Sequence, residues 1–187
     1  MLFRSSYDLP FGPGRYWGGQ WTGVLKNLLG GWALNGTNSI RSGLPVNVQM
    51  TPRQSGCVAQ SCNERPDLRP GGSINPVLKN WKPERYFDPS NFVVQPLGYF
   101  GNVGRNTLIR PGQLSLNLAL TKINQVAEGK SLEFRAELFN FLNHPNFGTP
   151  NGNVFTDAAG TLDPNVGRIT TTSTPMRQVQ LGLKYIF

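Results

Sequence analysis

Apolar and polar residues alternate at the end of the chain. Arg177–Phe187 has apolar residues at every second position, namely Val179, Leu181, Leu183, Tyr185 and Phe187. Gln178, Gln180 and Lys184 stand between them. Because successive side chains of a strand point to opposite faces, this pattern predicts a strand with one apolar face and one polar face.

A second region repeats the pattern as a pair of strands. In Leu114–Asn124, four leucines alternate with small or polar residues. Leu132–Leu142 alternates in the same way, with Glu133, Arg135 and Glu137 on its polar face. Glu128-Gly129-Lys130 lies between them and is a tight-turn signal, so the two segments predict a hairpin.

The N-terminal part predicts further elements. Phe3–Leu9 and Trp32–Arg41 are expected strands, and Val46–Val48 extends the second beyond a bend at Ser42–Pro45. Helical spacing of apolar residues predicts a short helix over Gln20–Leu29, ended by two glycines. Val166–Thr172 is a candidate short strand.

The connections between these elements alternate between moderate and long. Residues 51–110 and 143–175 are rich in Pro, Gly and Asn and predict long loops. In an up-and-down meander, alternate connections fall at the same end. Outer-membrane barrels show this asymmetry, and their tilted strands need about 9–11 residues, which the best three strands supply. We therefore predict an all-β fold: an antiparallel up-and-down transmembrane β-barrel segment of about five strands, incomplete as a barrel, with long extracellular loops.

Composition agrees with strands separated by polar loops. Hydrophobic residues make up 38% of the 187 residues, and 22 Gly and 15 Pro are present. The net charge is +8, but Lys and Arg are scattered singly, which argues against a nucleic-acid partner. No run approaches the length of a membrane-spanning helix, and no signal peptide is evident. We therefore expect the chain to be the C-terminal piece of a longer protein.

Candidate chemistry is sparse. Cys57 and Cys62 lie in a short C-V-A-Q-S-C segment, where a disulfide is expected in an oxidising compartment, against the alternatives of a metal site or two free thiols. The single histidine, His144, has no nucleophile motif or metal cluster around it in the sequence. We expect no enzymatic activity and no cofactor.

Several motifs resemble TonB-dependent outer-membrane receptors, most closely the Oar-like group. The segment F-R-A-E-L-F-N-F-L-N-H-P-N-F-G, residues 134–148, resembles their penultimate-strand signature. Y-D-L-P-F-G, G-G-W, S-G-L-P, G-N-V-G-R-N and the terminal L-G-L-K-Y-I-F also match, in the expected order along nearly the whole chain. The resemblance implies that residues 1–187 form the C-terminal portion of a receptor barrel, without the plug domain.

The resemblance also implies roles for particular residues. Gln180, Gly182, Tyr185 and Phe187 fit the C-terminal signal that the barrel-assembly machinery reads in outer-membrane proteins. The polar positions of the strands would line the lumen: Ser115, Asn117, Thr121, Glu133, Arg135, Glu137, Gln178, Gln180 and Lys184. Residues 51–110 and 143–175 would be external loops.

The partners implied by the resemblance follow from this role. They are outer-membrane lipid, the barrel-assembly machinery, a TonB-type energy-coupling protein acting through a plug that this chain lacks, and an unidentified transported substrate. The expected location is the outer membrane of a Gram-negative bacterium. The alternative is a secreted β-sandwich that binds carbohydrate through the loop aromatics Trp81, Tyr86 and Tyr99.

Overall fold

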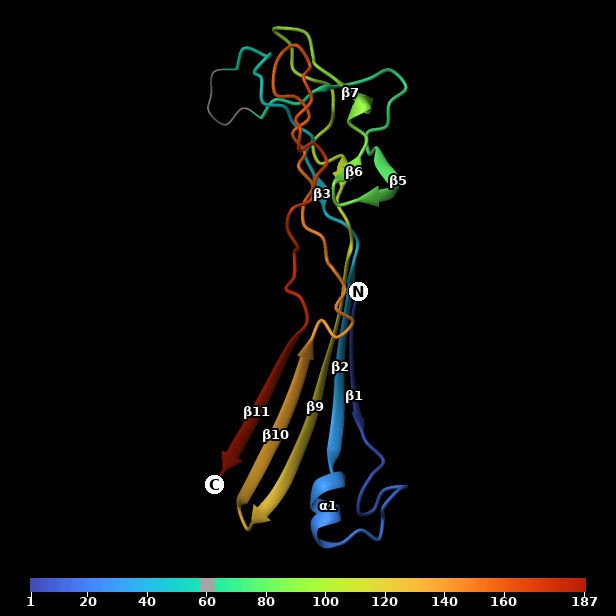
Figure 1. Ribbon diagram of the computed structural model, residues 1–187, viewed down its shortest axis with the longest axis vertical. Coiled ribbons are helices and arrows are strands. Elements are labelled where there is room, and N and C mark those ends of the chain that lie inside the picture. The colour runs from blue at the N-terminus through green and yellow to red at the C-terminus, as the bar shows by residue number, and fades with distance from the viewer. Residues whose placement is uncertain (58–62) are drawn as a thin grey trace. The chain divides into compact units, whose positions relative to one another are not determined.

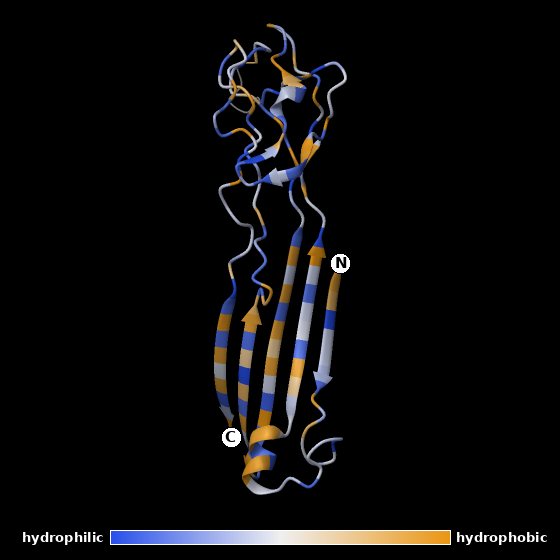
Figure 2. Ribbon diagram, turned by 45° about the vertical axis from the view of Figure 1, so that its right-hand side comes forward, coloured by the Kyte–Doolittle hydropathy of each residue, from blue (hydrophilic) through white to orange (hydrophobic). Residues whose placement is uncertain are grey.

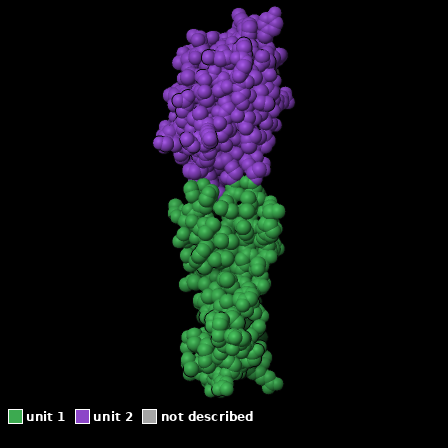
Figure 3. Space-filling model, turned by 90° about the vertical axis from the view of Figure 1, so that its right-hand side faces the viewer, with its two compact units in different colours: residues 1–41, 113–145, 175–187 green, residues 42–112, 146–174 purple. Residues whose placement is uncertain are grey.

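The computed structural model describes residues 1–57 and 63–187 and contains two compact units (Figures 1 and 3). The first, here called the sheet unit, contains Met1–Arg41, Gln113–Pro145 and Pro175–Phe187. The second, the loop unit, contains Ser42–Gly112 and Asn146–Thr174. The two long connections of the sheet therefore fold together as one body.

The sheet unit is an antiparallel five-stranded sheet with the order β1-β2-β9-β10-β11 (Figure 1). Its strands are β1 (Leu2–Asp8), β2 (Trp32–Arg41), β9 (Gln113–Ala127), β10 (Lys130–Phe139) and β11 (Gln178–Ile186). Within the described residues, β1 and β11 are edge strands and do not pair with each other. The predicted number of strands and their antiparallel arrangement are confirmed.

The connections of the sheet separate by length. Glu128 and Gly129 alone join β9 to β10, and Gly129 adopts the positive φ of 71° that this tight turn requires. Because Arg41 pairs with Gln113, the chain leaves β2 and enters β9 at the opposite end of the sheet. Phe139 and Gln178 pair at that same end. Both long connections therefore start from one end of the sheet, as predicted.

A short helix, α1 (Gly23–Leu29), lies in the connection between β1 and β2. It starts three residues later than the predicted Gln20, because Gly18 has a positive φ and residues 19–20 form a turn ahead of the helix. Its apolar residues Val24, Leu25 and Leu28 are all exposed. No helix in the described part of the chain is long and apolar enough to cross a membrane.

The described residues of the loop unit form six short strands in three two-stranded antiparallel sheets, and one 3-10 turn, η1 (Pro89–Asn91). The pairs are β3 (Pro45–Val46) with β8 (Leu108–Ile109), β4 (Asp67–Leu68) with β7 (Phe92–Val93), and β5 (Val77–Lys82) with β6 (Arg85–Phe87). Predicted as mostly loop, this region instead surrounds a buried hydrophobic core.

Aromatic and branched residues from both long connections form that core. Its members are Val48, Met50, Tyr86, Phe87, Phe92, Val103, Leu108, Val154, Phe155 and Ile169. Backbone hydrogen bonds join the two connections, for example from the Gln49 amide to the Gly152 carbonyl and from the Val154 amide to the Gln49 carbonyl. The predicted strand over Val166–Thr172 does not form, because the chain turns at its start, where the Val166 amide donates to the Asp163 carbonyl and the Arg168 amide to the Asn165 carbonyl.

Candidate membrane-facing sheet and loop-unit cavity

The register of the sheet places its apolar residues on one face, here called the apolar face. In β10 and β11, Leu132 pairs with Tyr185, Phe134 with Leu183, and Leu138 with Val179. In β9 and β2, Leu120 pairs with Leu34 and Leu114 with Ile40. Residues that pair directly across an antiparallel ladder lie on the same face of the sheet. The apolar positions predicted in single strands therefore form one continuous surface across β2, β9, β10 and β11. Figure 2 shows it as alternating orange and blue bands along the strands.

Side chains of the apolar face are exposed at the C-terminal edge. Leu183 is 70% exposed, and Val179 and Leu181 are exposed to a similar extent. No part of the described chain covers them. A soluble protein rarely leaves a contiguous apolar surface of this kind in water, whereas a strand in lipid presents one.

Lys122 is the charged exception on the apolar face, where it pairs with both Trp32 and Phe134. Its side chain is 4% exposed, and its Nζ donates to the backbone carbonyls of Leu28 and Gly30 at the end of α1. The ammonium also lies 5.0 Å from the centre of the Trp32 ring. Carbonyl and aromatic partners satisfy a charge that apolar surroundings would otherwise penalise.

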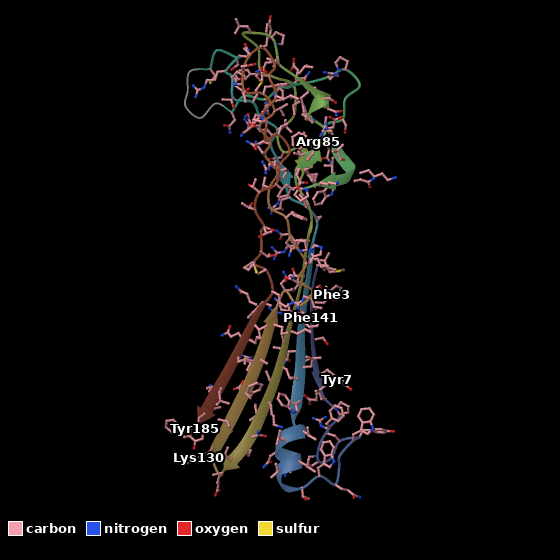
Figure 4. The ribbon with its side chains drawn as sticks, in the orientation of Figure 1. Phe3, Tyr7, Arg85, Lys130, Phe141 and Tyr185 are labelled. Carbon is pink, nitrogen blue, oxygen red and sulfur yellow. The ribbon has the colours of Figure 1, made fainter. Side chains whose placement is uncertain are left out.

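Aromatic residues gather near the turn end of the sheet. Trp32 contacts Phe134 edge to face at 5.9 Å, and Tyr185 stacks on Phe187 at 6.0 Å. Figure 4 shows Tyr185 near Lys130, at the hairpin end of the sheet, and Phe3 and Phe141 near the opposite end. Aromatic residues at strand ends are the usual anchors at a membrane interface.

The opposite face of the sheet, here called the polar face, carries all nine polar side chains proposed from the sequence to line a lumen. Glu133 pairs with Lys184, Arg135 with Gly182 and Thr121, and Glu137 with Gln180. Ser115, Asn117 and Gln178 follow in the same register. The structure therefore brings these residues together on one surface. That this surface lines a lumen stays a prediction.

Charges and amides on the polar face interact with one another. Arg135 Nε lies 3.8 Å from Glu137 Oε1, and Glu133 lies directly across the ladder from Lys184. Asn35 Nδ2 donates to Thr121 Oγ1 at 3.5 Å, so β2 and β9 are also linked. The face is polar and balanced in charge along β10 and β11, which suits contact with water rather than lipid.

Asn140 follows the last residue of β10 and hydrogen-bonds to the segments beyond it. The amino-acid sequence did not predict this role. It has a φ of 48°, and its amide N–H donates to Asn117 Oδ1 at 2.9 Å. Its Nδ2 donates to the carbonyls of His144 and Pro175, and its Oδ1 accepts from the His144 amide. The left-handed backbone conformation of Asn140, which asparagine tolerates, ends the extended strand. β10 therefore stops at Phe139 rather than at the predicted Leu142.

The four residues of the expected assembly signal lie on β11 or just after it. Gln180 and Gly182 belong to the polar face, and Tyr185 belongs to the apolar face. A Cβ added to Gly182 would meet only the Cβ of Arg135 at 3.9 Å and its carbonyl oxygen at 4.0 Å. These are ordinary contacts, so packing within the sheet gives no reason for glycine at this position.

Cys57 is disulfide-bonded. Its predicted partner, Cys62, lies outside the described residues, so that pairing stays a prediction. No cluster of three or more potential metal ligands occurs in residues 1–57 and 63–187.

The loop unit contains a cavity of about 600 Å³. The described residues that line it are Asn47, Gln49, Cys57, Asn63, Arg65, Phe100 and Arg105. This volume falls within the range of about 300–1,000 Å³ that is usual for small-molecule sites. The lining contains two guanidinium groups, three side-chain amides and one aromatic ring, and no carboxylate among these residues.

The aromatic residues of the alternative carbohydrate-binding site are mostly packed in the core. Tyr86 is 4% exposed, its hydroxyl donates to the Ile109 carbonyl at 2.9 Å, and burial raises its pKa. Trp81 packs edge to face against Tyr86 at 5.0 Å and against Phe147 at 5.3 Å. Of the predicted three, only Tyr99 is exposed. The structure does not favour a binding surface formed by these three residues.

Comparison with known proteins identifies the family. The model of the family described as "Outer membrane beta barrel domain" matches residues 1–180. The chain belongs to this family. No curated protein and no solved structure matches it.

Membership in the family explains the two-faced sheet. A strand of an outer-membrane barrel faces lipid on one side and the barrel interior on the other. The chain is therefore a barrel-type protein of the Gram-negative outer membrane. That its exposed apolar face meets lipid stays a prediction. The prediction of outer-membrane location is confirmed, and the β-sandwich alternative is not favoured.

Proposed function

We propose that this outer-membrane barrel domain is the C-terminal barrel segment of a TonB-dependent receptor of the Oar-like type, which takes up a substrate. The observation that carries the proposal is the combination, in one chain, of a two-faced sheet with two open edges and long connections that fold into a unit with its own core.

The open edges support a larger barrel. Unpaired backbone groups at β1 and β11 would be costly in lipid, so strands from elsewhere must complete the barrel. The polar face, with Glu133, Arg135 and Lys184, lines the lumen in this proposal. Loop-unit residues face outward and capture the substrate before it enters the lumen.

The energy for transport comes from a partner. An inner-membrane coupling protein pulls on the plug domain of the complete receptor, and a path opens along the polar face. No residue of the chain is assigned a catalytic role, and no cofactor is required for this mechanism.

Assembly uses the terminal strand. The barrel-assembly machinery reads Gln180, Gly182, Tyr185 and Phe187 while the edge of β11 is unpaired. The space around Gly182 supports this role. Packing within the sheet would accept a larger side chain there, so recognition by a partner can explain the glycine. The proposal expects Gly182→Leu to slow assembly more than it destabilises a barrel that has already formed.

The experiment that tests the proposal begins with the gene. We expect the DNA upstream of Met1 to encode, in frame, a plug domain and a TonB-contacting segment. Candidate substrates can then be screened by growth of the native bacterium with and without its energy-coupling protein. Two results together would contradict a receptor function: an upstream region that encodes no plug, and growth that does not depend on the coupling protein. Only the assignment to an outer-membrane barrel would then remain.

A further inference from the structure

We propose that the loop-unit cavity binds acidic oligosaccharides, with Arg65 and Arg105 as the anion-binding residues and Phe100 as a stacking surface. This inference rests on the proposed receptor function and names the substrate class that the loop unit captures. It is carried by the chemistry of the lining residues and by the way in which the surrounding chain holds them.

No carboxylate among the described residues forms an ion pair with either arginine. Neither guanidinium group forms an ion pair or a hydrogen bond among the described residues. Arg65 is only half-buried and Arg105 is exposed, and both line the same cavity of about 600 Å³. A guanidinium group offers a planar set of donors that matches a carboxylate or sulfate, so an unpartnered pair around one cavity favours an anionic ligand.

The acidic residues next to Arg65 in the sequence are engaged elsewhere. Glu64 is 2% exposed and accepts hydrogen bonds from Ser55 and from Gln95 Nε2. Asp67 Oδ1 accepts the amide N–H of Asn102 at 2.8 Å. Neither carboxylate lines the cavity, so the charged groups among its described lining residues are the two arginines.

The walls of the cavity are held in place before a ligand arrives. Asn102 joins them, because its amide donates to Asp67 and its Oδ1 accepts from the Leu68 amide at 2.7 Å. Gly101 packs so closely that an added Cβ would clash with the Arg65 carbonyl oxygen. These contacts fix the Phe100–Arg105 segment against the Arg65 segment, and such preorganisation lowers the entropic cost of binding.

The remaining lining residues suit a sugar. Asn47 Oδ1 already accepts the Asn106 amide at 2.8 Å, which orients its Nδ2 donor, and Gln49 and Asn63 add further amides. Amides can donate to and accept from hydroxyl groups. Phe100 is 69% exposed at the cavity and offers a flat apolar surface for the C–H face of a sugar ring. The cavity is larger than a single inorganic anion needs.

The test uses the complete receptor purified from the outer membrane in detergent. Titration calorimetry compares a tetramer of galacturonic acid with a neutral galactose tetramer of the same linkage. We expect the acidic tetramer to bind and the neutral one to bind at least about tenfold more weakly, because charge-assisted bonds to two arginines are lost. Affinity for the acidic tetramer should also fall as salt rises.

Matched variants locate the site. Arg65→Gln and Arg105→Gln should each weaken binding of the acidic tetramer by about tenfold, whereas Arg69→Gln should leave it unchanged. Arg69 belongs to the same unit and does not line the cavity, so it controls for the change in net charge. Protease resistance of the loop unit shows that each variant is folded.

The outcomes separate this inference from the proposed function. Equal affinity for both tetramers, no binding of either, or wild-type binding by the doubly substituted Arg65→Gln, Arg105→Gln variant would overturn the acidic-oligosaccharide site. Uptake of some other substrate that still requires the coupling protein would leave the receptor function standing while this site falls.

Discussion

The sheet unit and the loop unit place their apolar side chains in opposite ways. Every residue of the buried hydrophobic core belongs to the loop unit. In the sheet unit, long apolar side chains such as Leu181 and Leu183 are exposed, while Lys122 and Asn140 are buried. The loop unit is therefore organised like a protein in water, and the sheet unit like one in lipid, within a single chain.

This difference separates the sources of stability. The loop unit gains stability from apolar area that it removes from water by itself. The sheet unit buries little apolar area by itself, so hydrogen bonds along the ladder and an apolar environment for its exposed face are the expected sources of its stability. A substitution should consequently damage one unit and leave the other intact.

The largest effect is expected in the core of the loop unit. Phe87 is 0% exposed and packs edge to face against Phe92 at 6.2 Å. Phe87→Ala leaves a cavity in a closed core and should cost about 3–5 kcal/mol. We expect rapid protease cleavage of the loop unit in outer-membrane vesicles, with a normal amount of inserted barrel.

Phe100→Ala is the matched control, because this phenylalanine is exposed and belongs to the same unit. It should leave protease resistance unchanged. Equal cleavage of the two variants, or loss of the inserted barrel in Phe87→Ala alone, would show that the loop unit is not an independent folding body.

The second effect concerns the lipid face. Leu116→Arg or Leu183→Arg puts a charge on the apolar face and should cost about 2–4 kcal/mol near the middle of the membrane. Ser115→Arg, one residue from Leu116 but on the polar face, should be tolerated. Urea titration of the barrel in lipid vesicles measures the stability of the leucine variants and of the serine variant. Similar midpoints for Leu116→Arg and Ser115→Arg would exclude lipid contact at Leu116.

The sheet unit was the predictable half of the molecule, for a physical reason. Four of its strands, β2, β9, β10 and β11, have nine or more residues, which is long enough for an alternation with a period of two to be recognised. The predicted bounds of β2, Trp32–Arg41, are those observed. The same alternation predicts a shared face for the nine polar positions, and the register of the sheet places them on one face.

The loop unit escaped prediction because its contacts are distant in sequence and its strands are short. β3, β4, β7 and β8 have two residues each, too few to show a period. Val48 and Val154 share one core although they come from different long connections. The isolated aromatics Trp81, Tyr86, Phe87 and Phe92 were the available signal, and they are members of the core or pack against it. Likewise, no local pattern predicted that Lys122 would bond the end of α1.

A third effect, of intermediate size, concerns the end of β10. Asn140→Ala removes the side-chain bonds to His144 and Pro175 and puts alanine at a φ of 48°. Loss of these buried bonds should cost about 2 kcal/mol. Asn140→Gly loses the same bonds but accepts the left-handed conformation, so its cost should be smaller. Urea titration of both variants in lipid vesicles gives the comparison, and a glycine variant less stable than the alanine variant would refute the backbone argument.

The smallest effect is expected for a carboxylate of the loop unit, and it depends on pH. Burial raises the pKa of Asp163, but hydrogen bonds from the Asn153 and Asn151 side chains and the Asn165 amide outweigh it and hold that pKa below its usual value. Because the pKa is lower in the folded state, the stabilisation is fully present above the unfolded value of about 3.9 and is lost as pH falls through the folded value.

Asp163→Asn should accordingly destabilise the loop unit by about 1 kcal/mol at pH 7. The difference from wild type should shrink as the pH is lowered below about 4, where protonation removes the same charge from the wild-type side chain. Limited proteolysis across a pH series measures it, with Glu84→Gln, an exposed carboxylate of the same unit, as control. A difference that stayed constant from about pH 7 to about pH 3 would mean that the introduced amide disturbs packing. The hydrogen-bonded charge of Asp163 would then contribute nothing to the stability of the loop unit.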